Sequence, residues 1–188
     1  MAGIVASILL SAAHWGYRRA VQKEQSAELS TAASKGDIER VRLLLERGID
    51  PNSFDDSPEK TPALIRACGV DKEIAWELVD VLLEAGADVN VLGPGQTTAL
   101  MYATYMGNAE VARALVSAGA SLSATDVNGH TAAHWAARSG QLEIVRMLKM
   151  AGADFGARDR VHDTPRDLAK RNRREDVLKW LESVGVKT

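Results

Sequence analysis

The sequence has little cysteine, few aromatic residues and almost no net charge. Cys68 is the only cysteine among 188 residues, which excludes an intramolecular disulfide and a zinc site built from several thiolates. A net charge of −2 provides no general attraction for polyanions such as nucleic acids. Aromatic residues make up only 5%, while alanine, leucine, glycine and valine are abundant, which favours packed short helices over a β-sandwich.

Sequence motifs of enzymes are also absent. The chain has no glycine-rich phosphate loop, and the GPGQ stretch at residues 93–96 predicts a turn instead. His130 and His134 have the i, i+4 spacing of a zinc-protease helix, but Thr131 stands where such an enzyme has its catalytic glutamate. We therefore expect no enzymatic activity, no cofactor, no metal site and no small-molecule substrate.

A phrase of about 33 residues recurs along the chain. TALMYATYMGNAEVARALVSAGASLS from Thr98 aligns without gaps to TAAHWAARSGQLEIVRMLKMAGADFG from Thr131, and the phrase returns from Thr164. Two earlier copies precede these, the second with about three extra residues near Gly69 to Glu73. The period predicts a separate N-terminal segment, residues 1–25, followed by five units: 26–57, 58–94, 95–127, 128–160 and 161–188.

Each unit is predicted to form two short helices. A threonine can act as the N-cap of the first helix, and a proline at its first position loses no hydrogen bond. These residues are Thr61, Thr98, Thr131 and Thr164, with Pro62 and Pro165. The second helix has apolar residues at i, i+3, i+4 and i+7 and ends at Gly48, Gly86, Gly119 or Gly152. No unit can bury its apolar stripe alone, so neighbouring units must stack.

This pattern resembles the ankyrin repeat family. EAGADVN at residues 84–90 and NGHTAAHWAARSGQLEIVRML from Asn128 carry the resemblance, which covers about residues 26–184. It implies an all-α ankyrin solenoid of stacked helix-turn-helix units, with β-turn fingers and a concave groove between the fingers and the inner helices. It also implies that His134 is a structural hydrogen-bonding residue and that His130 belongs to a turn. The resemblance implies a monomeric, non-enzymatic module that binds an unidentified partner protein.

The concave positions that vary in this family are the candidate partner-binding residues. In the inner helices they are Tyr102, Tyr105, Met106, Trp135, Arg138 and Ser139. In the fingers they are Phe54, Val127, Arg158 and Arg160. Tyrosine, tryptophan and arginine are enriched at interface hot spots, because they bring a large contact area together with a polar group. The alternative is that some of these side chains only cover the inner helix of a neighbouring unit.

Charge is distributed unevenly along the chain. Residues 26–97 hold 14 acidic and 7 basic side chains, whereas residues 158–188 hold 6 acidic and 9 basic ones. The basic stretch RDLAKRNRRE could bind the phosphates of nucleic acid or of an anionic lipid. A terminal repeat must also present a polar face to water. We therefore expect a capping role for this stretch and rank phosphate binding second.

The N-terminal segment lies outside the repeats. Residues 2–17 carry no charge and are followed by Arg18, Arg19 and Lys23. A helix over residues 2–17 would be about 24 Å long, short of the ~30 Å hydrocarbon core of a bilayer. A membrane anchor, a soluble helix packed on the first unit and a cleaved signal all remain open. We expect a cytoplasmic protein, which the first alternative would tether to the cytosolic face of a membrane.

Overall fold

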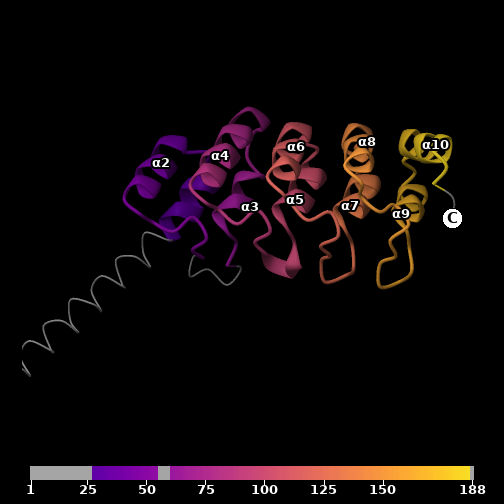
Figure 1. Ribbon diagram of the computed structural model, residues 1–188, viewed down its shortest axis with the longest axis horizontal. Coiled ribbons are helices and arrows are strands. Elements are labelled where there is room, and N and C mark those ends of the chain that lie inside the picture. Colours follow the sequence, from indigo (N-terminus) through magenta and orange to yellow (C-terminus); the bar gives the residue numbers. More distant parts are fainter. Residues whose placement is uncertain (1–26, 55–59, 187–188) are drawn as a thin grey trace, which may run out of the picture.

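In the computed structural model, the chain forms pairs of antiparallel helices stacked side by side (Figure 1). The structure describes residues 27–54 and 60–186. The inner helix of each pair lies next to the finger loops, and the outer helix lies at the opposite edge of the stack. Within the described ranges the regular structure is helical and contains no strand. The predicted all-α solenoid of stacked helix pairs is therefore confirmed.

The helices follow the predicted two-helix units. The inner helices are residues 27–35, α3 (Ala63–Ala67), α5 (Ala99–Met106), α7 (Ala132–Ser139) and α9 (Pro165–Arg171). The outer helices are α2 (Ile38–Glu46), α4 (Lys72–Glu84), α6 (Ala109–Ser117), α8 (Leu142–Met150) and α10 (Glu175–Ser183). A short 3-10 turn, η1 (Pro94–Gln96), lies in the finger before α5. The predicted N-terminal segment, residues 1–25, lies outside the described residues. Among the helices of the described ranges, none has the length and apolar character needed to cross a membrane.

Side-chain caps begin the later inner helices, as the sequence predicts. The Thr98 hydroxyl accepts a hydrogen bond from the backbone N–H of Met101 at 3.3 Å. The Thr164 hydroxyl accepts from the backbone N–H of Asp167, whose carboxylate accepts in return from the N–H of Thr164, so the two residues form a capping box. Gly107 ends α5 with a φ of 70°, a left-handed conformation in which other side chains are strained.

The second unit departs from the predicted pattern. Pro62 occupies the N-cap position of α3, so the prediction that Thr61 caps this helix and that Pro62 follows as its first residue is wrong by one position. Helix α3 has only 5 residues, whereas α5 and α7 have 8 each. Helix α4 has 13 residues, whereas α6 and α8 have 9 each. The extra residues predicted near Gly69 to Glu73 thus belong to a unit with a long outer helix and a shortened inner helix.

Small side chains allow the inner helices to pack closely. The alanines at one equivalent position are all 0% exposed: Ala67, Ala103, Ala136 and Ala169. Cys68 follows this row as the C-cap residue of α3, and its alignment with Thr104, a small packed position, predicts that it is buried. It is 1% exposed. Leu115 and Leu148 of the outer helices are also fully buried. Burial of one leucine side chain stabilises a fold by about 1.5–3 kcal/mol, and each of these side chains needs a neighbouring unit to cover it.

Neighbouring units are also joined by hydrogen bonds along the fingers. The backbone N–H of Val127 donates to the carbonyl of Gly95 at 2.9 Å, and the N–H of Arg160 donates to the carbonyl of Asn128 at 3.0 Å. These bonds satisfy finger backbone groups and hold successive fingers side by side. The three fingers that contain Gly95, Val127 and Arg160 therefore form one continuous edge of the array (Figure 1).

Asparagine side chains form a second link between the early units. The Asn90 amide accepts a hydrogen bond from the N–H of Ser121 at 2.7 Å and donates to the carbonyl of Gly119 at 3.3 Å. Asn52 makes the same pair of bonds to the following unit. Ser123 occupies the equivalent position in the third unit and has no amide with which to form this bridge.

Candidate partner-binding site

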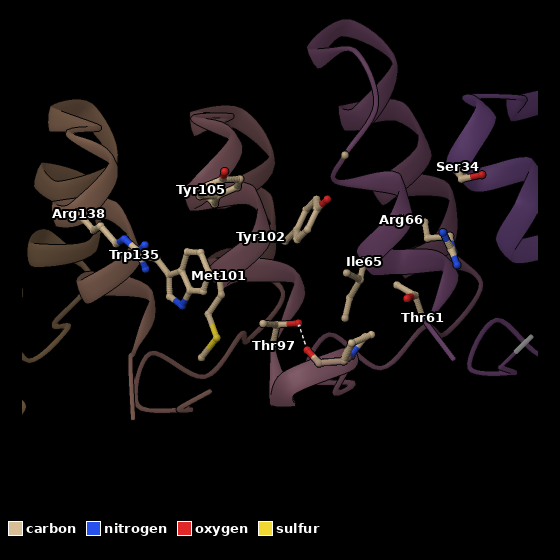
Figure 2. Close-up of a pocket in the computed structure, with 12 residues that line it drawn as sticks. Ser34, Thr61, Ile65, Arg66, Thr97, Met101, Tyr102, Tyr105, Trp135 and Arg138 are labelled. Carbon is tan, nitrogen blue, oxygen red and sulfur yellow. Dashed lines mark hydrogen bonds between the residues drawn. The ribbon is translucent and has the colours of Figure 1, made fainter. Parts of the chain in front are cut away.

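A hollow of about 660 Å³ opens on the side of the inner helices that faces the fingers (Figure 2). We call it the concave hollow, and it is lined by Ser34, Thr61, Ile65, Arg66, Gly69, Pro94, Thr97, Met101, Tyr102, Tyr105, Trp135 and Arg138. Figure 2 shows the two arginines at opposite ends, with the two tyrosines between them. The structure thus brings four of the predicted residues, Tyr102, Tyr105, Trp135 and Arg138, into one cavity.

The aromatic side chains of the concave hollow support one another. The rings of Tyr105 and Trp135 meet edge to face, with 5.5 Å between their centroids. The guanidinium carbon of Arg138 lies 5.9 Å from the centroid of the Trp135 ring, within the range of a cation–π contact. The indole N–H of Trp135 donates to the Asp126 carboxylate at 3.2 Å, and this bond holds the indole against the finger that precedes α7. We call Tyr102, Tyr105 and Trp135 the aromatic wall. Contacts within the protein hold Tyr105 and Trp135 of this wall in place without a partner.

The concave hollow exists because the second unit has a short inner helix. Counted from the N-cap, Gly69 occupies the position that Tyr105 and Arg138 fill in the next two units. A Cβ atom on Gly69 would lie 3.1 Å from the Tyr102 ring, closer than side chains ordinarily pack. The absence of a side chain at Gly69 therefore leaves room for the Tyr102 ring and opens the space in front of α3.

Sequence reasoning missed several residues of the concave hollow. Arg66 corresponds to Tyr102 and Trp135 once Pro62, rather than Thr61, is aligned with the next N-cap. That alignment was available in the phrase PALIRAC, which matches the TALMYAT stretch of the next unit without a gap. Ile65 and Met101 of the floor lie one position earlier in the same helices. They escaped prediction because an apolar residue at that spacing is typical of an ordinary core position.

The other predicted residues lie outside the concave hollow. Met106 is 39% exposed at the end of α5, and Ser139 is half-buried at the end of α7. None of the finger residues lines the hollow either. All four are exposed: Phe54, Val127, Arg158 and Arg160. Arg158 donates to the carbonyl of His162 within its own finger. The structure therefore divides the predicted set into four residues that line the concave hollow and six that lie outside it.

His134 is a structural residue at the start of α7. Its Nδ1 atom accepts the backbone N–H of Thr131 at 3.1 Å, and its Nε2 atom lies 3.2 Å from the carbonyl oxygen of Asp163 in the next unit. With Nδ1 accepting, the proton of the neutral ring belongs on Nε2, which donates to that carbonyl. Burial lowers the pKa of His134 and outweighs the opposing effect of the hydrogen bond to Asp163. Both ring nitrogens are thus engaged within the protein.

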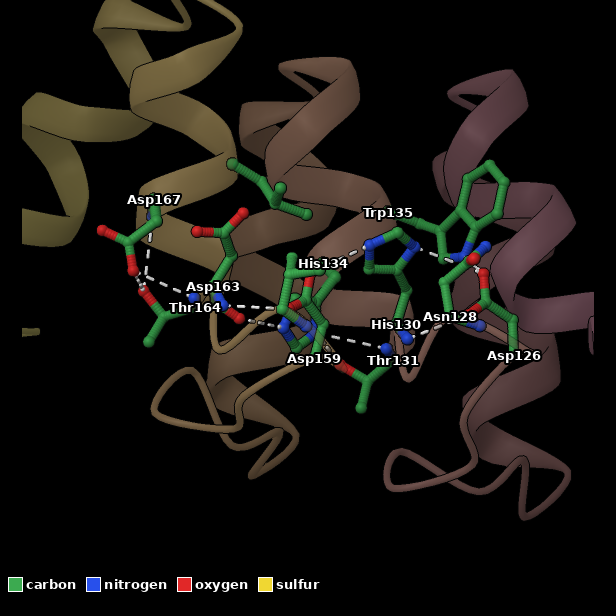
Figure 3. A network of polar contacts seen from close by, with 12 residues as sticks. Asp126, Asn128, His130, Thr131, His134, Trp135, Asp159, Asp163, Thr164 and Asp167 are labelled. Carbon is green, nitrogen blue, oxygen red and sulfur yellow. Dashed lines mark hydrogen bonds and ion pairs between the residues drawn. The ribbon is translucent and has the colours of Figure 1, made fainter.

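His130 has a larger structural role than the sequence predicts. Its ring nitrogens lie 3.3 Å from the Asp126 carboxylate and 3.1 Å from the Asp159 carboxylate, so the imidazole bridges two successive fingers (Figure 3). Burial alone would raise the pKa of Asp159, but hydrogen bonds from the backbone N–H groups of Asp163 and Val161 lower it, aided by the neighbouring imidazoles. Across residues 27–54 and 60–186, no cluster of three or more histidine, cysteine or carboxylate side chains is arranged to hold a metal ion.

The lone cysteine is unsuited to nucleophilic chemistry. Cys68 is 1% exposed, and its thiol contacts the carbonyl oxygen of Leu64 at 3.3 Å. Burial raises the pKa of the Cys68 thiol to about 12, whereas a nucleophilic cysteine needs a stabilised thiolate. Cys68 therefore serves as a small side chain between packed helices.

Several basic residues of the last unit make contacts within the protein. Arg166 pairs with Glu182 at 2.7 Å, and Arg171 pairs with Asp163 at 2.5 Å. The Arg174 side chain donates to the carbonyl oxygen of Arg138 at 2.9 Å, which joins the last unit to the end of α7. The capping role expected for the basic stretch stays a prediction.

Comparison with known proteins identifies the repeats. The sequence matches the family described as ankyrin repeats in three copies over residues 29–126 and again over residues 64–159. Ankyrin repeat, SAM and basic leucine zipper domain-containing protein 1 from Dasypus novemcinctus is 38% identical over 89 residues, which are 46% of this chain and 18% of that protein. The protein of the same name from Otolemur garnettii is 40% identical over 86 residues, covering 44% of this chain and 17% of the relative. The match thus spans less than a fifth of the length of either relative.

Proposed function

The chain belongs to the ankyrin repeat family, and from that premise we propose that it binds a partner protein through the concave hollow. Ankyrin repeats are generally protein–protein interaction modules, and the family is generally non-enzymatic. The observation that carries the proposal is the exposed aromatic wall of the hollow. Tyr102 is 38% exposed and Tyr105 is 54% exposed, although both belong to an inner helix whose other face is buried.

The chemistry of this wall supports an interface rather than simple packing. The Tyr105 ring contacts Trp135 of the next unit in an edge-to-face arrangement, and more than half of the surface of Tyr105 remains exposed. Burial of such an aromatic side chain in a partner contributes about 2 kcal/mol or more at a hot spot. Because Trp135 is held by Asp126, little side-chain entropy is lost when a partner covers the wall. The wall therefore combines a large contact area with a preformed shape.

Affinity capture with matched variants tests the proposal. We expect Tyr105→Ala to lose the proteins captured by the unchanged chain, because the variant removes the most exposed part of the wall. Trp76→Ala is the control, since Trp76 is 47% exposed on outer helix α4 and lies outside the concave hollow. Circular dichroism must show the same helix content for both variants. Capture that survives Tyr105→Ala but is lost in Trp76→Ala would place the interface on the outer helices.

Further expectations belong to the same proposal. The repeat domain would comprise residues 26–188 in the five units given above, and it would act as a monomer that binds neither nucleic acid nor a small-molecule substrate. The protein would be cytoplasmic, and residues 2–17 would be a candidate attachment to a membrane. Light scattering of the purified chain tests the monomer, and cell fractionation with and without residues 1–25 tests the attachment.

A further inference from the structure

The two tyrosines of α5 lie toward different neighbouring units. The Tyr102 ring lies beside Gly69, the bare backbone position that follows α3. The Tyr105 ring meets Trp135 of α7, with 5.5 Å between the ring centroids. The concave hollow therefore has two notches. The first notch lies between α3 and α5 and is lined by Ile65, Gly69 and Tyr102. The second notch lies between α5 and α7 and is lined by Tyr105 and Trp135.

The distance between the notches matches the repeat of a polyproline II helix. Three successive inner helices bound the two notches, and adjacent packed helices lie about 8–10 Å apart, so the notches are separated by about the same distance. A polyproline II helix has about three residues per turn and advances about 3.1 Å per residue, so its residues i and i+3 lie on one side, about 9 Å apart. In a β-strand the residues on one side repeat about every 7 Å, which is too short.

The hollow presents hydrogen-bond donors that have no partner. Across the described ranges, the hydroxyls of Tyr102 and Tyr105 make no hydrogen bond. The exposed Arg138 guanidinium is stacked on Trp135 and makes no hydrogen bond within those ranges either. Of the side chains that line the hollow, all of them described, none is a carboxylate or an amide. The open side-chain groups are therefore rich in donors and poor in acceptors.

A proline-rich segment has the complementary chemistry. Proline has no backbone N–H, and the carbonyl groups of a polyproline II helix make no internal hydrogen bonds, so such a segment presents acceptors and few donors. An ordinary extended segment also brings N–H groups, for which the hollow has few acceptors. Carbonyl oxygens carry a partial negative charge, which suits the cationic Arg138. Grooves lined by aromatic side chains bind proline-rich segments, because the preformed helix loses little entropy on binding.

We propose that the concave hollow binds a proline-rich segment of the partner protein in the polyproline II conformation, with two prolines three positions apart and one proline in each notch. The hydroxyls of Tyr102 and Tyr105 and the guanidinium of Arg138 donate to its carbonyl groups. This inference rests on the proposed function, since it assumes that the concave hollow is the interface. Arg66 takes no part in the recognition, because it donates to the Ser30 hydroxyl at 3.2 Å.

A random-peptide phage library panned against the full chain tests the proposal. We expect the recovered peptides to share two prolines three positions apart, and calorimetry then gives the affinity of a synthetic recovered peptide. Replacing either proline with alanine should weaken binding roughly tenfold, because one notch loses the ring that fills it. Inserting one residue between the prolines should weaken binding at least as much, because the second proline then misses its notch. Equal affinity of the two spacings would overturn the proposal.

Three variants test where the peptide binds. Tyr105→Phe removes only the hydroxyl and should weaken peptide binding roughly fivefold, the effect of one lost hydrogen bond. Arg138→Met removes the N–H donors, keeps an apolar stem and should weaken binding by a similar factor. Arg146→Met is the matched control, because Arg146 lies over the Trp180 ring at 5.9 Å, the same separation as in the Arg138 and Trp135 pair, but on outer helix α8. The control should bind the peptide as tightly as the unchanged chain, and circular dichroism should show equal helix content in all three variants. Equal loss of binding in Arg146→Met and Arg138→Met would overturn the assignment to the concave hollow.

The remaining outcomes separate this inference from the proposed function. Recovered peptides that lack the proline pair, acidic ones included, but lose binding in Tyr105→Ala would overturn the proline-rich ligand and leave the concave interface standing. Proline-rich peptides that bind Tyr105→Ala and Arg138→Met as tightly as the unchanged chain would overturn this inference, because they would bind outside the hollow. No recovered peptide at all would also overturn it, whereas affinity capture with Tyr105→Ala tests the concave interface separately.

Discussion

At the residue scale, His134 holds the start of α7 and the end of the next finger together, and this makes stability depend on pH. A histidine in the unfolded chain has a pKa of 6.5, and burial lowers the pKa of His134 in the fold. Below pH 6.5 the unfolded chain therefore binds a proton that the folded chain does not. The free energy of unfolding decreases as the pH is lowered from 6.5 to the pKa of His134 in the folded chain. Above pH 6.5 this group contributes no pH dependence.

The variant His134→Gln isolates this effect. We expect urea unfolding of the unchanged chain to give a lower stability at about pH 5 than at about pH 7, and we expect His134→Gln to reduce this difference. The variant should itself be less stable at neutral pH by about 1 kcal/mol or more, since it loses part of the hydrogen bonding at Thr131 and Asp163. Identical pH profiles for the two chains would show that another group causes the dependence.

His130 is the second residue with a clear expected effect. Its removal leaves the buried carboxylates of Asp126 and Asp159 without their shared partner, although each keeps hydrogen bonds from its own finger. We expect His130→Ala to lower the free energy of unfolding by about 1–3 kcal/mol, because two buried carboxylates each lose a hydrogen-bonding partner that joins the two fingers. The sequence alone predicts a mild effect because it assigns His130 only to a turn. Urea unfolding measures this free energy, and a decrease below about 0.5 kcal/mol would support the turn role of His130.

At the element scale, the links between units differ along the stack. The asparagine bridges join the first three units, and the third unit has Ser123 at the equivalent position. We expect Ser123→Asn to form the same two bonds to the following unit and to raise the free energy of unfolding by about 1 kcal/mol. Asn90→Ser is the reciprocal control and should lower it by a similar amount. Equal stability of all three chains in urea would show that the bridges contribute nothing.

At the scale of the whole molecule, a stack of repeats is stabilised mainly by contacts between neighbours. Helix α6 packs between α4 and α8, whereas α10 packs against α8 and α9 at the end of the stack (Figure 1). We expect backbone amides of α10 to exchange with deuterium about tenfold faster or more than those of α6, because terminal units open without the rest. Hydrogen exchange followed by mass spectrometry measures this. Equal protection of both helices would indicate that the stack unfolds as a single unit.

The sequence by itself determined the period, the paired helices and most of their ends. These features depend on short-range chemistry: a threonine or asparagine caps the helix that follows it, and a left-handed glycine ends one. The resemblance to ankyrin repeats placed Tyr102, Tyr105, Trp135 and Arg138 on one face, because they occupy equivalent concave positions of adjacent inner helices. It also identified Cys68 as a packed residue from its alignment alone.

Only the tertiary structure decided that this face contains a cavity. The concave hollow depends on the shortened α3, on the bare backbone at Gly69 and on the contact of Trp135 with a finger aspartate. The role of His130 likewise depends on Asp159, which lies 29 positions along the chain and a full unit away. Such features arise where neighbouring units meet, and their geometry follows from the stacking of one unit on the next rather than from the residues of either unit alone.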